Sequence, residues 1–340
     1  MCIKKYGFIA LLLSMVIILT AGCGSSGRNK SAEPAAPNYP TQPITVIAPA
    51  GPGSGWDLTA RSVTQILTEK KLVSVAMPVE NRAGGGGAVA LSHVVENKKG
   101  AEDTLIVYSP PLLLINLNGQ TKFSYKDLTP IAKLFSDYQF IGVKKDSKFK
   151  TLDDVMNALK ADPKSVKIGG ASSPGSMDHL SFMMAAAQKG VNVKEVPYLS
   201  FQGGGELIAG LLGGSIDVVS TSVGDILGQL EAGNVRGLAV TSPERLKDQR
   251  LKDILTLKEQ GIDATFEVWR GIFGPPQMPD YAKNYIADAI AKMVETDEWR
   301  ATLTKYNWQN TYLPGDDFVK FLDEQNQLLE GILKNLGLIK

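Results

Sequence analysis

Histidine, cysteine and serine are the residue types that could support catalysis or metal binding in this 340-residue chain. His93 and His179 lack the additional His, Asp or Glu at fixed spacing that a zinc site requires. Ser54 is not in a nucleophile elbow, because Pro52 occupies the position of that motif's first glycine. The sequence also has no phosphate-binding P-loop. We therefore expect no enzymatic activity, no metal site and no cofactor.

One motif supports a different class of protein. Residues 85–90 (GGGAVA) fit the dinucleotide-binding pattern G-x-G-x-x-A between a predicted strand and a predicted helix. The acidic residues Glu102 and Asp103 follow at a plausible distance. A single match is weak, however, and the N-terminus considered below indicates export to a compartment with little free nicotinamide cofactor. A dinucleotide-binding oxidoreductase remains a minor alternative.

Three loops rich in glycine, serine and other small residues follow predicted strands, at 51–56, 84–87 and 170–176. In open α/β sheets, ligands bind beyond the carboxyl ends of strands. Glycine lets backbone N–H groups approach a ligand, and a following helix directs N–H groups and a positive dipole end toward it. The hydroxyl groups of Ser172, Ser173 and Ser176 add neutral donors. Any one of these loops could be an ordinary turn, but together they favour a carboxylate or another small anion as ligand.

The elements that would hold these loops alternate between strand and helix in two successive units, which is typical of a parallel α/β sheet. The sequence predicts an N-cap at Asp57 and a capping box at 151–154. An isolated apolar segment at 269–274 and an amphipathic tail at 317–338 follow the second unit. The predicted strands are 44–48, 73–79, 104–109, 140–143, 167–169, 194–198, 217–220 and 236–241, and the predicted helices include 58–71, 88–97, 176–189, 206–212 and 225–231.

The N-terminus resembles a bacterial lipoprotein signal. Basic Lys4 and Lys5 precede an apolar run at 8–19, which is too short to span a membrane, and then the sequence LTAGC ends at Cys23. We predict a signal peptide at 1–22, acylation of Cys23 and a flexible tether at 23–38, with an uncleaved signal anchor as the alternative. Thr20 departs from the leucine that is commoner in this motif.

Charge and cysteine content narrow the remaining possibilities. The chain has 36 basic and 35 acidic residues, so no basic excess is available to hold nucleic acid. Its only cysteines are Cys2 and Cys23, so a body that begins near residue 39 has no disulfide. A body of about 300 residues exceeds one ordinary core, which indicates two domains.

Several segments resemble, in order, the receptors of tripartite tricarboxylate transporters, the TctC/Bug group. The resemblance extends over 40–340. It is carried by 47–61 (IAPAGPGSGWDLTAR), 80–88 (ENRAGGGGA), 196–198 (VPY) with 203–206 (GGGE), 238–242 (LAVTS) with Arg245, and 269–271 (WRG). The aromatic residue before Asp-Leu-Thr and the Arg-Gly pair are closer to the tricarboxylate branch than to the amino-acid branch.

The resemblance implies an α/β fold with two lobes, the class II periplasmic-binding-protein or Venus-flytrap fold, each lobe a mainly parallel sheet flanked by helices. We place lobe 1 at 39–140 and 243–340 and lobe 2 at 141–242. The implied protein is an extracytoplasmic, monomeric receptor, anchored as a lipoprotein on the outer face of the membrane. It would deliver a di- or tricarboxylate, with citrate favoured, to a permease of this transporter type. A lipid-anchored sensor module for a signalling kinase is the alternative.

The resemblance also implies the ligand-binding residues. Those of the first loop are Gly53, Ser54, Gly55, Trp56 and Asp57, and those of the second are Ala171, Ser172, Ser173, Gly175, Ser176 and Asp178. Ser54 replaces a glycine that is usual in the family, and Pro174 interrupts the second loop.

Some side chains have two possible roles. Trp56 either walls the pocket or packs inside, and Asp57 either offers its N–H to the ligand or caps a helix. Arg270 either grips a ligand carboxylate with two hydrogen bonds or forms a structural ion pair. We expect the Asp178 carboxylate to interact with the positive end of a helix dipole rather than to form a catalytic pair with His179. Tyr198 would bind ligand or line the hinge, and Ser109 and Ser220 would end strands that face the cleft.

Overall fold

A computed structural model of the protein describes residues 38–339. The predicted signal at 1–22, the lipid site Cys23 and residues 23–37 of the tether lie outside this range. Within it, no helix is long and apolar enough to cross a membrane.

The first part of the chain forms three parallel strands in the order β2-β1-β3, namely β1 (Thr45–Ala48), β2 (Val79–Asn81) and β3 (Thr104–Tyr108). Each strand leads through a loop into a helix: α1 (Gly55–Glu69), α2 (Ala88–Asn97) and α3 (Pro111–Leu117). All five residues of β3 are buried, because helices cover both faces of a parallel sheet. The loops that follow these strands therefore emerge at one edge of the sheet.

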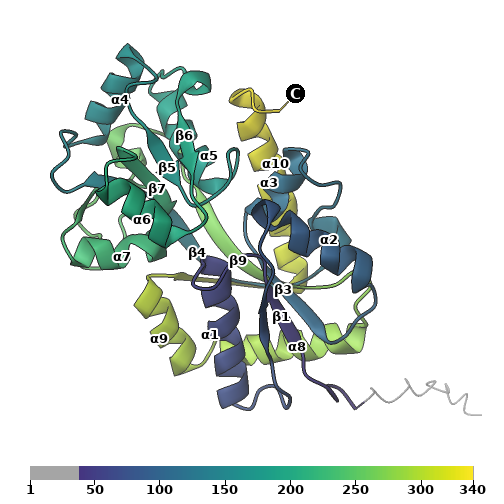
Figure 1. Ribbon diagram of the computed structural model, residues 1–340. Helices are drawn as coiled ribbons and strands as arrows, with labels where there is room; N and C mark the ends of the chain where they lie inside the picture. The colour runs from purple at the N-terminus through teal and green to yellow at the C-terminus, as the bar shows by residue number, and fades with distance from the viewer. Residues whose placement is uncertain (1–37, 340) are drawn as a thin grey trace, which may run out of the picture. The chain divides into compact units, whose positions relative to one another are not determined.

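A 16-residue strand, β4 (Thr129–Lys144), connects the two parts of the sheet. Its first half pairs antiparallel with β9 (Glu267–Gly274) and β10 (Gln309–Pro314). Its second half pairs antiparallel with β7 (Val218–Ser222) and β8 (Val235–Val240). Figure 1 shows β4 and β9 running between the two groups of helices. β4 thus belongs to both parts of the sheet.

The middle of the chain forms the other group, in which β5 (Ile168–Gly170) lies between β6 (Tyr198–Ser200) and β7, all parallel. Its helices are α4 (Leu152–Ala161), α5 (Met177–Gln188), α6 (Gly204–Leu212) and α7 (Val223–Glu231), and they gather around these strands in Figure 1. Single-turn 3-10 helices lie at Gly85–Gly87, Tyr125–Asp127, Val193–Glu195 and Lys258–Gln260.

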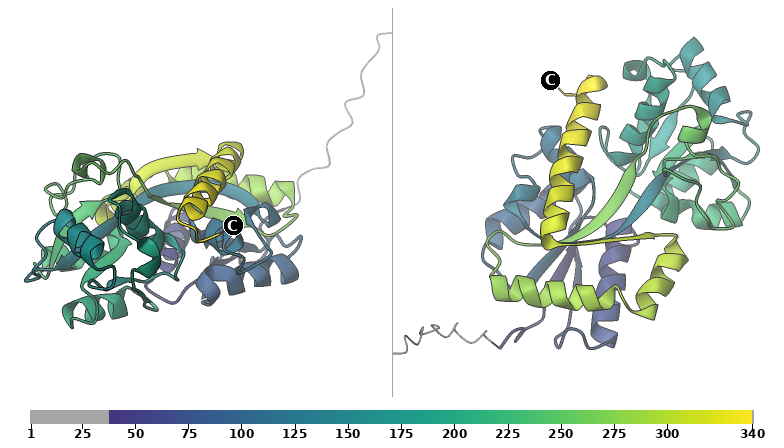
Figure 2. Two further views of the ribbon diagram at one scale, coloured as in Figure 1. Left: turned by 90° about the horizontal axis from the view of Figure 1, so that it is seen from above. Right: turned by 180° about the vertical axis from the view of Figure 1, so that it is seen from behind.

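The C-terminal helices return to the first group. They are α8 (Asp280–Met293), α9 (Asp297–Tyr306) and α10 (Gly315–Asn335), and the view from behind in Figure 2 shows α10 standing beside the sheet. α8 packs against α1, and α10 packs against α3 and β4. The buried side chains of Val46, Val63, Ile290 and Trp299 unite β1, α1, α8 and α9 in one apolar core.

Several sequence predictions need correction. The N-cap of α1 is Ser54 rather than Asp57, so the helix begins three residues before the predicted start. Only the last residue of the predicted strand 73–79 is in β2. Of the predicted strand 194–198, only Tyr198 is in β6, and Lys194 and Glu195 lie in a 3-10 turn. The predicted strand 140–143 is one part of β4. The sheet is mixed, because β9, β4, β8 and β10 are antiparallel to their neighbours. The capping box at Thr151 is confirmed.

Candidate functional site

The first loop is held at the N-terminus of α1 by Asp57. Ser54 Oγ accepts a hydrogen bond from the Asp57 backbone N–H at 3.3 Å. The Asp57 carboxylate is 2% exposed and accepts hydrogen bonds from the Gly53 N–H (2.9 Å) and Asn81 Nδ2 (2.8 Å), and it pairs with Arg61 at 2.9 Å. Burial alone would raise the pKa of Asp57, but these donors lower it. Asp57 therefore shapes the loop, and both its N–H and its carboxylate are already engaged.

Trp56 lies half-buried beside the second glycine loop. Its Nε1–H donates to Ser109 Oγ at 2.9 Å, and its ring meets Tyr108 edge-on at 5.9 Å between centroids. A Cβ placed on Gly87 would lie 3.4 Å from the Trp56 ring. Ser109 itself is fully buried, so it orients the indole rather than facing solvent. Trp56 thus forms a wall between the loops after β1 and β2.

The third loop leads from β5 into α5 and is tied together by Asp178. The Asp178 carboxylate accepts hydrogen bonds from the Ala171 N–H (2.9 Å) and from Gln139 Nε2 (3.0 Å) of β4. Its backbone N–H donates to Ser172 Oγ at 3.0 Å, and Tyr198 Oη–H donates to the Ser172 carbonyl at 2.8 Å. Ser172 Oγ also forms a side-chain hydrogen bond with the Asp178 carboxylate, so the Ser172 hydroxyl holds the loop together.

A close approach and a hydrogen bond bring the two groups of elements together at these loops. A Cβ on Gly86 would lie 3.5 Å from Ser173 Oγ. Asn118, just after α3, donates from Nδ2 to the Gly175 carbonyl at 3.0 Å. The three loops predicted to bind an anion therefore face one another, although they come from distant parts of the chain.

Backbone donors at both helix starts are free. Within 38–339, the N–H groups of Gly55 and Trp56 in α1, and of Met177 and His179 in α5, have no hydrogen-bond partner. These groups carry the positive end of each helix dipole. The two helix starts are therefore equipped to receive negatively charged oxygen atoms.

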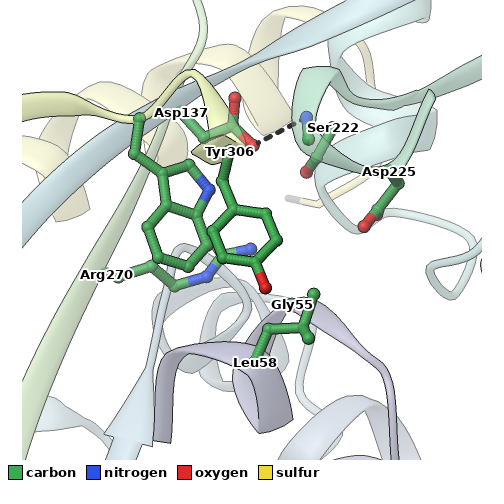
Figure 3. Close-up of a pocket in the computed structure, with 9 residues that line it drawn as sticks. Gly55, Leu58, Asp137, Ser222, Asp225, Arg270 and Tyr306 are labelled. Carbon is green, nitrogen blue, oxygen red and sulfur yellow. Dashed lines mark hydrogen bonds between the residues drawn. The ribbon is translucent and has the colours of Figure 1, made fainter. Parts of the chain in front are cut away.

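Arg270 of β9 lies beside the start of α1, near Gly55 in Figure 3, and is 4% exposed. Its Nη1 donates to the Trp269 carbonyl at 3.3 Å, its Nε has no partner, and it forms no ion pair with a carboxylate in the described part of the chain. A Cβ on Gly55 would lie 2.6 Å from Nη2, so only glycine fits there without displacing the guanidinium. Burial lowers the pKa of Arg270, although the nearby acids oppose this. Of the two roles considered for Arg270, the structural ion pair is not formed within residues 38–339.

A small cavity of about 10 Å³, enough for one water-sized group, adjoins Arg270 and is lined by Gly55, Leu58, Asp137, Ser222, Gly224, Asp225, Arg270, Tyr306 and Trp308. Asp137 of β4 accepts hydrogen bonds from the Tyr138 N–H (2.7 Å) and the Gly224 N–H (3.3 Å), and a dashed line at the labelled Asp137 marks the longer bond in Figure 3. Burial raises the pKa of Asp137 to about 7, although Arg270 opposes the shift. Burial, with the nearby charge of Asp225, likewise raises the pKa of Asp178 to about 7.

Sequence reasoning missed Asp137 and Asp225 as neighbours of Arg270. Asp137 lies just before the predicted strand 140–143, where Lys133, Ser136 and Gln139 also interrupt the apolar pattern, so no local signal marks it. Asp225 was placed at a helix start without a partner. Neither motif nor spacing connects these two acids with Arg270, which is 45 positions beyond Asp225 in the chain.

The predicted site residues divide by accessibility. Those partly or fully open to solvent are Gly53, Ser54, Gly55, Trp56, Ala171, Ser172, Ser173 and Tyr198. Those that are buried are Asp57, Ser109, Gly175, Ser176, Asp178, Ser220 and Arg270. Ser220 lies in the middle of β7 and contacts Ser181 Oγ at 3.2 Å, so it does not end a strand as predicted.

The comparisons with known proteins agree with this geometry. A model of the family described as "Tripartite tricarboxylate transporter family receptor" matches residues 59–338. A protein from the gbd 5′ region of Cupriavidus necator is 27% identical over 330 residues, which cover 94% of this chain and 95% of that protein. Protein BugT of Bordetella pertussis is 27% identical over 239 residues, 69% of each chain.

Solved structures show the same fold. A TctC solute-binding protein from Polaromonas shares 26% identity with a TM-score of 0.66, covering 87% of this chain and 99% of that one. MatC from Rhodopseudomonas palustris with bound malate shares 20% identity with a TM-score of 0.77, covering 87% and 100%. Another R. palustris protein, with adipate, shares 21% identity with a TM-score of 0.80, covering 88% and 99%. The two-lobed periplasmic-binding-protein fold is confirmed, and the chain belongs to the tripartite tricarboxylate transporter receptor (TctC) family.

Proposed function

We propose that this solute-binding receptor captures a small di- or tricarboxylate between the starts of α1 and α5. The observation that carries the proposal is a buried guanidinium without a carboxylate partner beside free helix N–H groups. A buried charge is costly unless it is paired. A ligand carboxylate at Arg270 would supply the missing partner, and the α1 dipole would add to the attraction.

The surrounding acids do not cancel this attraction. Burial raises the pKa of Asp137 and of Asp178 to about 7 and also raises the pKa of Asp225, so burial disfavours the charged form of all three acids. Asp57 is already neutralised by Arg61. A positive field from Arg270 and two helix starts is therefore available to an anion.

The two anion-attracting helix starts favour a ligand with more than one carboxylate. One carboxylate would meet Gly55, Trp56 and Arg270, and another would meet the N–H groups of α5 with the hydroxyl of Ser173. The malate and adipate bound by two structural neighbours belong to this class. Citrate, which the sequence motifs favour, is a further candidate.

The remaining parts of the proposal follow from the family. The receptor would be monomeric, extracytoplasmic and anchored through Cys23, and it would deliver its ligand to a permease of the tripartite tricarboxylate type. The lobes at 39–140 with 243–340 and at 141–242 would close about β4, which pairs with strands of both. Ligand contacts from both sides would shift the population toward the closed state.

A thermal-unfolding panel on the full chain tests the proposal. It would include succinate, malate, adipate, citrate, tricarballylate, glutamate and acetate, with NAD for the oxidoreductase alternative. A ligand present at a hundredfold excess over its dissociation constant should stabilise the protein by about 2.7 kcal/mol. We expect a di- or tricarboxylate to raise the melting temperature and acetate to have little effect. Stabilisation by NAD alone, or by no carboxylate at all, would contradict the proposal.

A further inference from the structure

Gly175, in the loop that leads into α5, is held from two sides. Its carbonyl accepts the hydrogen bond from Asn118 Nδ2 at 3.0 Å, and its N–H donates to His179 Nδ1 at 3.0 Å. Gly175 has φ of +77°, and a Cβ there would lie 3.0 Å from Asn118 Nδ2. Any other residue would be strained and would push the Asn118 amide away.

The two supports belong to different groups of elements. Asn118 caps the C-terminus of α3, in the segment proposed as lobe 1. His179 is in the first turn of α5, in the segment proposed as lobe 2, and its ring packs on Tyr198 at 4.6 Å between centroids. Burial lowers the pKa of His179 to about 4, so the ring is neutral at pH 7 and Nδ1 can accept. His179 thus fixes the loop to its own helix, and Asn118 fixes it to the opposite group.

We infer that Asn118 is a positioning residue that latches the start of α5 against α3, so that both anion-attracting helix starts face one ligand. The inference deepens the proposed function and rests on it for the ligand. The Asn118 amide touches the loop rather than the ligand, so its loss acts by letting the loop and the complex open. Among related complexes, changes of this kind act mainly on dissociation rates.

The replacement Asn118→Ala removes the amide that donates to the Gly175 carbonyl and adds no charge near the anion site. Asn116→Ala is the matched control, because Asn116 lies on α3 and its amide bonds locally to the Thr121 carbonyl at 3.3 Å. The first measurement is hydrogen exchange of residues 171–179 in the ligand-free full chain. The second is the association and dissociation rates of the carboxylate that stabilises the wild type most in the thermal panel.

We expect Asn118→Ala to accelerate exchange in 171–179 and to raise the dissociation rate by about three- to tenfold, the loss of one ordinary hydrogen bond, with the association rate little changed. Asn116→Ala should leave both unchanged. Unchanged exchange in Asn118→Ala would overturn the latch whether or not a ligand binds. Faster exchange with unchanged dissociation would overturn the positioning role. If the wild type binds no carboxylate, the proposed function fails, and the exchange experiment alone decides the latch.

Discussion

The substitution Gly55→Ala provides a defined perturbation of the proposed carboxylate site. The added methyl group would lie 2.6 Å from Arg270 Nη2, whereas carbon and nitrogen atoms in ordinary contact are about 3.5 Å or more apart. The guanidinium must therefore shift by about 1 Å. Because Arg270 is 4% exposed, it has little room to do so while keeping its orientation.

We expect Gly55→Ala to weaken ligand binding and to have little effect on folding. A hydrogen bond to a charged group contributes about 1.5–3 kcal/mol, which corresponds to about a 10- to 150-fold weaker complex. Replacing glycine by alanine at a compatible backbone position stabilises a protein by about 0.4–1 kcal/mol, which offsets part of the cost of moving Arg270. Gly55 has no positive φ, so the backbone tolerates alanine.

Isothermal titration calorimetry and chemical unfolding measure the two effects separately. The control is Gly228→Ala, on α7, where an added Cβ meets no atom within 4 Å. The control should bind like the wild type and be slightly more stable. If Gly55→Ala folds and binds a carboxylate with wild-type affinity, Arg270 does not hold the ligand at the start of α1.

Three other substitutions test separate parts of the account. Asp137→Asn should reduce the pH dependence of the free energy of unfolding. Because the native pKa of Asp137 is about 7, ionisation of this buried carboxyl lowers the free energy of unfolding as pH rises, by about 0.8 kcal/mol between pH 6.5 and 8. Urea unfolding at both pH values would show it, and an unchanged difference would contradict it. Ser54→Ala should cost about 1 kcal/mol in unfolding free energy through the lost N-cap, and wild-type stability would count against that role. Ser173→Ala should leave stability unchanged and weaken carboxylate binding by about 1 kcal/mol in calorimetry, and unaltered affinity would remove Ser173 from the site.

Local sequence signals predicted most of the elements correctly. Short β-branched runs and amphipathic periods located β1, β3, α2, α5 and α10 within a few residues. The capping box at Thr151 located the start of α4. These signals depend on neighbouring residues alone, so no tertiary information was needed.

The long strand β4 could not be predicted for a tertiary reason. Its buried positions include Lys133, Ser136, Asp137 and Gln139, which interrupt any apolar pattern. Their partners are distant in sequence: Lys133 and Ser136 contact Glu267, and Gln139 contacts Asp178. Buried polar side chains of this kind find their hydrogen-bond partners only in the folded protein. Ser54 was similarly passed over as N-cap, because both Ser54 and Asp57 suit that position.

The sequence predicted which loops form the candidate site but not how their side chains are oriented. Glycine-rich loops and motif resemblance indicated residues at the starts of α1 and α5. They could not show that Asp57 and Asp178 face inward to tie those loops, or that Ser109 and Ser220 are buried. The environment of Arg270 required the packing of β4, β9 and α7 around one small cavity.

The central claim is that a carboxylate binds between the loops that start α1 and α5. Calorimetric titration of the most stabilising carboxylate into the wild type and into Ser173→Trp tests it most directly. Ser173 is partly exposed and faces Gly86, so an indole there would occupy the space between the loops. We predict one binding site per wild-type chain and no measurable binding in a folded Ser173→Trp variant. Equal binding by both proteins would contradict the account.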